Sequence, residues 1–169
     1  MTTPAPDAAT ASAVEAVLTL GDIDASQVAA LLAGYDLKLE LLPHDAEIPG
    51  SYWGAPETGL IGSTVYARAD TPVHSLLHET CHLIVLPPER RAAIHTDATD
   101  SIEEENAVCV LQALLGDQLA GVGRHRVLDD MDRGGYTFRL GSARAYFEQD
   151  ADDAFDWLRQ RNLLPAHAA

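Results

Sequence analysis

The sequence is poor in positive charge. Its 169 residues include 11 Lys and Arg against 26 Asp and Glu, which gives a formal net charge of -15 at pH 7. The only local basic groupings are Arg90-Arg91 and the Arg-His-Arg segment at 124–126. Because a surface this negative repels phosphate backbones, we expect no nucleic-acid partner.

Cysteine is scarce, and long apolar runs are missing. Cys81 and Cys109 each fall within an apolar helical pattern, which is typical of buried reduced thiols rather than of a disulfide framework. The N-terminal segment has no basic residue before its short apolar stretch and carries Glu15 within it, so it does not resemble a secretory signal. No run approaches the roughly 18 apolar residues that a membrane span needs. The sequence therefore predicts a cytoplasmic protein with no membrane partner, and nothing in it specifies an oligomeric state.

The length and composition suit one globular domain. Hydrophobic residues make up 47% of the chain and charged residues 22%, both ordinary values. Residues 1–12 are rich in Ala, Thr and Pro, and we expect them to form a disordered tail. Residues 13–169 are then expected to fold as a single domain.

The periodicity of apolar residues predicts both helices and strands. Short helices are expected at 13–20 and 24–32, and strands at 37–42 and 60–68. Thr71 before Pro72 is typical of a helix start, and Pro87-Pro88 ends this helix after Leu86. A further helix begins at Asp100 or Ser101 and continues to about residue 119. For the last third of the chain we expect a short strand at 136–140 and helices at 142–148 and 150–163.

His78, Glu79 and His82 form an HExxH motif, HETCH, within the predicted helix that ends at Leu86. Residues four apart stand on one helix face about 6 Å apart along the axis, so both imidazoles can converge on one ion. Glu79 is rotated by about 100° and can reach a water on that ion as a general base. The helix is apolar nearly all round, and burying two histidines and a glutamate without a partner would be costly. The motif therefore predicts a Zn2+ site, and the alternative is a pair of structural core histidines.

A catalytic zinc site needs a third protein ligand and an open position. Several residues that follow the motif can supply this ligand: His95, Asp97, Asp100 and the run Glu103-Glu104-Glu105. On a helical wheel Glu104 lies within about 60° of the apolar residues that face the core, whereas Glu103 and Glu105 lie at the flanks and suit the helix dipole. We therefore predict Glu104 as the third ligand, with Glu103, Asp97 and His95 as alternatives.

The motif followed 22 residues later by Glu104 resembles the gluzincin arrangement of zincin metallopeptidases. The segments LIGSTVYAR and EEENAVCVLQALL resemble the minimal zincin domain of bacterial ImmA/IrrE-like metallopeptidases. This resemblance implies zinc held by two His and one Glu, with the HExxH Glu as base. The fold that we expect is α+β: a zincin-like domain in which a small twisted sheet packs on the HExxH helix and the Glu104 helix, with a helical C-terminal cap.

The expected function is hydrolysis of a peptide bond in a peptide or protein substrate by zinc-activated water, with Glu79 as general base. Tyr136, His125 and His95 are candidates for a donor to the developing oxyanion. His74 lies about 12 Å from His82 by helix rise, too far to share the ion, so it supports a ligand, faces the substrate or is structural.

Two alternatives stay open. The strand at 60–68 either aligns an extended substrate by β-augmentation or is an ordinary sheet strand. The protein as a whole is either an enzyme or a zinc-stabilised regulatory or protein-binding module without turnover.

Overall fold

The computed structural model describes residues 15–98 and 101–168. The predicted tail at 1–12 and the candidate ligand Asp100 lie outside the described residues. The elements follow in this order: η1 Leu20–Asp22, α1 Ala25–Ala33, β1 Lys38–Leu41, β2 Gly59–Ile61, β3 Thr64–Ala67, α2 Val73–Val85, η2 Pro88–Ala93, α3 Ile102–Gly116, α4 Gly123–Arg133, α5 Ala143–Gln149, α6 Asp152–Gln160 and η3 Ala166–Ala168. The fold is α+β, as the sequence predicts. None of the helices in the described ranges has the length and apolar character that crossing a membrane requires.

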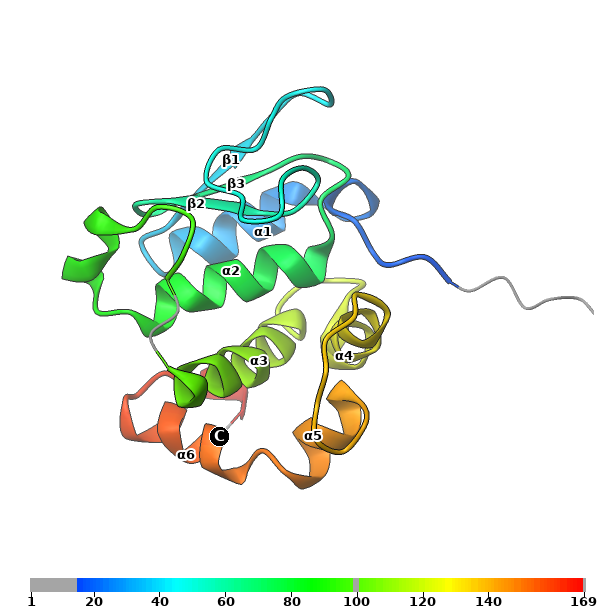
Figure 1. Ribbon diagram of the computed structural model, residues 1–169, viewed down its shortest axis with the longest axis vertical. Helices are drawn as coiled ribbons and strands as arrows, with labels where there is room; N and C mark the ends of the chain where they lie inside the picture. The colour runs from blue at the N-terminus through cyan, green and yellow to red at the C-terminus, as the bar shows by residue number, and fades with distance from the viewer. Residues whose placement is uncertain (1–14, 99–100, 169) are drawn as a thin grey trace, which may run out of the picture.

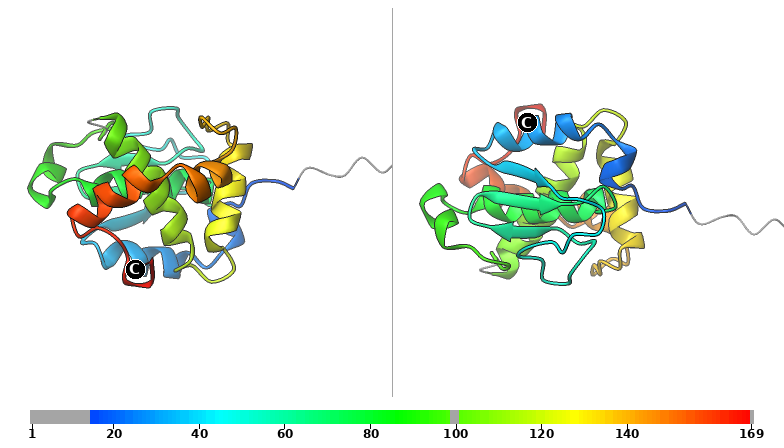
Figure 2. Two further views of the ribbon diagram at one scale, coloured as in Figure 1. Left: turned by 90° about the horizontal axis from the view of Figure 1, so that it is seen from below. Right: turned by 90° about the horizontal axis from the view of Figure 1, so that it is seen from above.

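The sheet has three strands in the order β1-β3-β2. β1 runs parallel to β3, and β2 pairs antiparallel with β3. The sheet lies on one side of α1 and α2, and helices α3 to α6 lie on the other side of α2 (Figures 1 and 2). The helix α2 is therefore central, between the sheet and the remaining helices.

The predicted strand 60–68 is in fact a hairpin, because Gly62 adopts a left-handed backbone with φ of 60° and the chain turns there. The outer edge of β2 already binds the chain's own backbone. The amide of Leu60 donates to the carbonyl of Gly50 at 3.2 Å, and the amide of Thr96 donates to the carbonyl of Leu60 at 2.9 Å. The backbone groups of Leu60 that would pair with an added strand are thus taken, which contradicts β-augmentation at this position.

Packing explains why α2 and α3 form. Eleven of the thirteen residues of α2 are buried, and the apolar ones meet the apolar residues of α3 in one core. Helix α3 starts at the N-cap Ser101, whose hydroxyl accepts a hydrogen bond from the amide of Glu104 at 3.2 Å. The expected cap of α2 is wrong: its N-cap is Pro72, and the Thr71 hydroxyl instead donates to the carbonyl of Pro56 at 2.6 Å.

The last third of the chain is all helical where it is regular. The predicted strand at 136–140 is absent, since Tyr136 and Phe138 pack against the core from an irregular segment rather than from a sheet. The amphipathic helix α4 was not foreseen. Its buried Asp130 accepts hydrogen bonds from Arg126 at 3.0 Å, from Arg133 at 2.7 Å and from the amide of Leu18 at 2.8 Å. This carboxylate ties the start of the described chain to α4.

Candidate metal centre

Two imidazoles from α2 meet at one point. The Nε2 atoms of His78 and His82 are 3.2 Å apart, and their rings stand nearly perpendicular, at 84°. The spacing of four residues places both side chains on the face of α2 that packs against α3. The sequence prediction that His78 and His82 converge is therefore confirmed.

The carboxylate that meets these rings belongs to Glu105. Its two oxygens each lie 3.0 Å from an imidazole, Oε1 from Nε2 of His78 and Oε2 from Nε2 of His82. One ligand atom from each of the three residues lies within 4.8 Å of the others, close enough to hold a metal ion. Two imidazole nitrogens and one carboxylate oxygen make a donor set that suits zinc.

Glu104, the predicted third ligand, lies on the other side of His82. Its Oε1 is 3.8 Å from Nδ1 of His82, whereas Nε2 of the same ring points to Glu105. The structure therefore brings Glu105, and not Glu104, to the centre. Glu104 is buried, as the helical wheel predicts. The imidazole nitrogens, however, converge at the edge of the contact between α2 and α3 and not in its middle.

The other predicted alternatives do not join this group of ligand atoms. Asp97 lines the cavity beside the centre, and His95 hydrogen-bonds through Nδ1 to the hydroxyl of Thr96 at 2.8 Å. Glu103 lines a different cavity. None of these three belongs to the group of ligand atoms that converges among the described residues.

Gln112 orients His78, a role that sequence reasoning missed. Its side-chain amide donates to the backbone carbonyl of His74 at 3.2 Å, so the amide oxygen must face His78. The Nδ1–H of His78 donates to that oxygen at 2.6 Å, so Nε2 is the nitrogen that faces the centre and can offer its lone pair to an ion. A polar signal was present in the sequence, since Glu105 and Gln112 are seven residues apart and share one face of an otherwise apolar helix.

Electrostatics at the centre favour positive charge. Burial lowers the pKa of His78, but hydrogen bonds to Cys109 and Glu105 outweigh it, and the pKa is raised well above its usual value. Burial acts to raise the pKa of Glu105, yet hydrogen bonds to His78 and His82 hold that pKa well below its usual value. A site that keeps a proton among these three groups also suits a bound cation.

Glu79 lies beside the centre at two adjoining cavities of about 330 and 290 Å³. Both cavities are lined by Tyr52, Trp53, His78 and Glu79. Burial raises the pKa of Glu79, and the neighbouring imidazoles oppose this only in part. A half-buried carboxylate with a raised pKa is a stronger base than an exposed one.

Tyr136 and His74 line the larger of these cavities. The Tyr136 hydroxyl is 3.4 Å from Nδ1 of His74, and the Tyr136 ring packs edge-on against His78 with centroids 5.5 Å apart. Burial raises the pKa of Tyr136 to about 12, so its hydroxyl stays protonated at neutral pH. His125 is elsewhere, with Nδ1 2.6 Å from Arg144.

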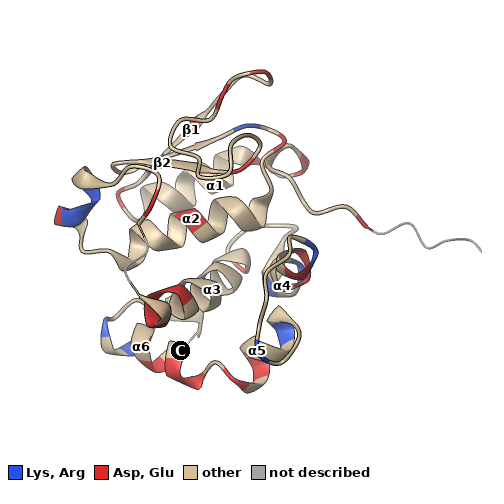
Figure 3. Cartoon of the chain, viewed as in Figure 1, with Lys and Arg blue, Asp and Glu red and all other residues tan. Residues whose placement is uncertain are grey.

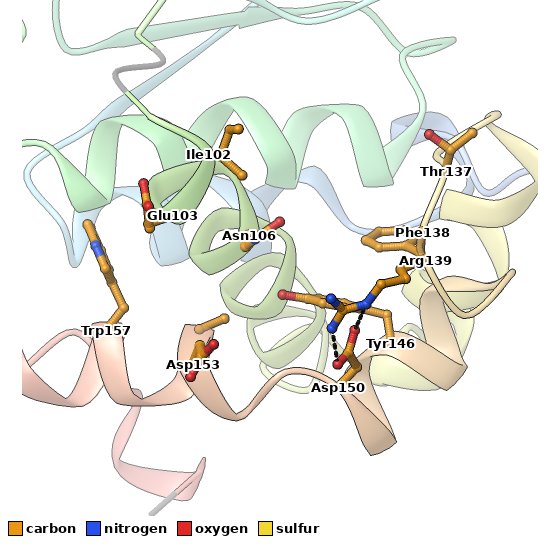
Figure 4. A pocket seen from close by; sticks show the side chains of 11 residues that line it. Ile102, Glu103, Asn106, Thr137, Phe138, Arg139, Tyr146, Asp150, Asp153 and Trp157 are labelled. Atoms are coloured by element: carbon orange, nitrogen blue, oxygen red, sulfur yellow. Dashed lines mark hydrogen bonds and ion pairs between the residues drawn. The ribbon is translucent and has the colours of Figure 1, made fainter.

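A separate cavity of about 410 Å³ lies between the start of α3 and the segment that leads into α5 and α6 (Figure 4). Glu103, Phe138, Tyr146 and Trp157 are among its lining residues, and on one side of it Arg139 pairs with Asp150. It contains neither imidazole of the centre. Its one cationic side chain is already paired with a carboxylate of the same cavity. We therefore do not take this cavity as the reactive site.

Comparison with models of protein families, with curated proteins and with solved structures found no match to this chain. The resemblance to zincins therefore stays a prediction from the motif, and the geometry of the centre carries the functional argument.

Proposed function

We propose that the protein is a zinc-dependent metallopeptidase. The observation that carries the proposal is the convergence of His78, His82 and Glu105, with Glu79 beside them at a cavity. The proposal corrects the expected ligand set by one residue and keeps the predicted base. A zinc ion, when bound, would lower the pKa of a water molecule and polarise the substrate carbonyl.

Glu79 supplies the base. It follows His78 directly on α2, so it approaches the same cavity from a different angle and is not part of the converging group. Its carboxylate takes a proton from the water that attacks the peptide carbonyl carbon, and then delivers that proton to the leaving amine nitrogen. The raised pKa of Glu79 suits both steps, because the group must accept and release a proton near neutral pH.

Tyr136 is the residue best placed to stabilise the oxyanion. Its hydroxyl lies at the cavity that contains Glu79 and remains a donor, since burial holds its pKa near 12. His74 neighbours this hydroxyl, and burial lowers the pKa of His74, so the ring is neutral and adds no charge there. Of the three donors considered from sequence, Tyr136 alone lines either cavity beside the centre.

The test combines metal content with cleavage. Purified protein should carry one zinc per chain, and it should cleave unfolded casein. Glu79→Gln should keep the zinc and lose about 100-fold to 10,000-fold in cleavage rate, the usual contribution of a general base. Normal folding without stoichiometric zinc, or equal cleavage by both proteins, would refute the proposal. Zinc binding without cleavage by either protein would favour the non-catalytic binding module.

A further inference from the structure

Two large aromatic side chains stand exposed at the mouth of the candidate site. Tyr52 is 69% exposed and Trp53 is 82% exposed, and their rings pack edge to face with centroids 4.9 Å apart. Both residues line both of the cavities that contain Glu79. Exposed aromatic pairs beside a polar centre are typical of ligand-binding surfaces rather than of cores.

The loop that carries this pair is anchored without using it. The loop closes at a neck formed by residues 50–51 and 59–60. There the amide of Leu60 donates to the carbonyl of Gly50. Ser51 pairs with Gly59 in an isolated antiparallel β-bridge. On the α2 side, the amide of Thr58 donates to the hydroxyl of Ser75 at 3.2 Å. These bonds tie the two ends of residues 51–58 to β2 and to the helix that bears the HExxH motif, so the aromatic pair stays next to the centre although it contributes little to folding.

The remaining lining residues define what the surface accepts. Glu57 lines one cavity, Asp97 and Glu105 line the other, and Glu79 lines both, whereas neither cavity is lined by Lys or Arg. A peptide carboxylate beside the two rings would meet the like charges of Glu57, Glu79 and Asp97, with no Lys or Arg in the lining to pair with it. An apolar side chain instead finds two ring faces to cover.

We propose that Tyr52 and Trp53 form the specificity surface of the site, which binds a large apolar side chain of a peptide next to the scissile bond and rejects an acidic one. This inference rests on the proposed peptidase function, because it assigns the aromatic pair to that substrate. Binding of the side chain covers rings that water otherwise contacts, and this supplies the hydrophobic gain.

The experiment follows binding without turnover. The sequence has two tryptophans, so zinc-loaded Glu79→Gln protein with Trp157→Phe retains Trp53 alone. It is titrated with acetyl-Ala-Ala-Phe-Ala-Ala-amide and with the same peptide carrying Glu in place of Phe. The Phe peptide should shift the emission of Trp53 to the blue and saturate, because it covers an exposed indole. The Glu peptide should bind at least tenfold more weakly.

Matched variants locate the effect. Added to the same background, Tyr52→Ala should weaken binding of the Phe peptide about tenfold, as expected for an aromatic hot spot. Leu41→Ala, which truncates a 50% exposed side chain on β1, should leave binding unchanged. Glu79→Gln protein with Trp53→Phe reports from Trp157 and should show no shift. Thermal unfolding of each variant checks that the fold is intact.

Failure of the inference is distinct from failure of the proposed function. An unchanged Trp53 emission, equal binding of the two peptides, or equal weakening by Tyr52→Ala and Leu41→Ala would overturn the specificity surface, even if wild type cleaves casein. A saturable Trp53 response that depends on Tyr52 would support the surface, and a wild type that then cleaves nothing would overturn only the peptidase.

Discussion

At the scale of single residues, the neighbours Glu104 and Glu105 hold two different places around His82. Glu105 faces Nε2 at 3.0 Å, and Glu104 lies 3.8 Å from Nδ1 on the opposite side of the ring. Glu104 is the more buried of the two, so burial alone would choose the wrong residue. The residue placed to supply the third ligand is the one at the flank, where the imidazoles emerge.

This geometry predicts a graded series of zinc affinities. Glu105→Ala should abolish stoichiometric zinc, because it removes a ligand. Glu104→Ala should weaken zinc binding about 10-fold to 100-fold, as is usual when a group behind a metal-binding histidine is lost. Glu103→Ala should leave it unchanged. Competition with a chromophoric chelator measures all three, and an order in which Glu104→Ala is the most damaging would restore the original ligand prediction.

Asp130 provides a second prediction at this scale. It is buried, and it accepts hydrogen bonds from Arg126, Arg133 and the amide of Leu18. Asp130→Ala removes the buried acceptor that two guanidinium groups and a backbone amide share, and it should lower the free energy of unfolding by about 2–3 kcal/mol.

The neighbouring Asp129 is the matched control. Its side chain is 44% exposed and pairs with the partly exposed Arg144, so Asp129→Ala should cost less than about 1 kcal/mol. Urea unfolding at pH 7 compares the two variants, and equal losses would show that the buried network contributes nothing beyond a surface ion pair.

At the scale of elements, the start of α3 couples helix capping to the metal centre. Ser101 caps the helix through the amide of Glu104, one residue before the proposed ligand Glu105. Ser142 caps α5 in the same way through the amide of Ala145 at 3.0 Å, far along the chain from the centre.

Both Ser101→Ala and Ser142→Ala should cost about 1 kcal/mol of stability, since each removes one cap. Only Ser101→Ala should also weaken zinc binding, because it frees the turn that positions Glu105. Calorimetric titration with zinc separates the two, and identical zinc affinities in both variants would uncouple the cap from the site.

The elements that bear the site were the best predicted from sequence. The HExxH helix and its successor have long apolar patterns with clear ends at Pro87 and Ser101, and both form within a few residues of the predicted bounds. Their packing brings His78, Glu79 and His82 to one cavity, as expected. Shorter segments were predicted less well. The backbone turn at Gly62 divides what looked like a single strand, and the apolar residues of 136–140 pack against the core from a loop.

What the sequence could not provide is the relative rotation of two packed helices. A helical wheel ranks residues by burial, whereas coordination depends on where a side chain from one helix meets a nitrogen from another. Gln112 was also missed, because a polar side chain in an apolar helix is informative only once its partners, His78 and the carbonyl of His74, are known.

At the scale of the whole molecule, the centre joins α2 to α3, the two helices at the middle of the fold. An ion that binds only the folded chain stabilises it, so zinc at 100 times its dissociation constant should add about 2.7 kcal/mol and raise the thermal midpoint by about 5–10 °C. Differential scanning calorimetry with zinc and with a chelator measures this. Glu105→Ala should not respond; a response equal to that of wild type would place the ion elsewhere.

The distribution of charge over the molecule is compatible with a cation at this centre. Acidic residues lie on α4, on α6, at the end of α5 and at the start of α3, whereas the loop next to α2 at 50–58 carries one, Glu57 (Figure 3). The negative field of the whole chain draws cations toward it, and the loop, with Glu57 as its one charged residue, leaves a largely apolar approach to the centre.

The glycine neck of that loop has an evolutionary consequence. A Cβ on Gly59 would lie 1.9 Å from the carbonyl oxygen of Pro49, and one on Gly50 would lie 2.3 Å from that of Leu60, so both positions must stay glycine. The residues between them carry no such constraint at their exposed tips. Selection is therefore free to exchange Tyr52 and Trp53 while the neck preserves the strand register, which would let the proposed substrate preference diverge independently of the proposed chemistry.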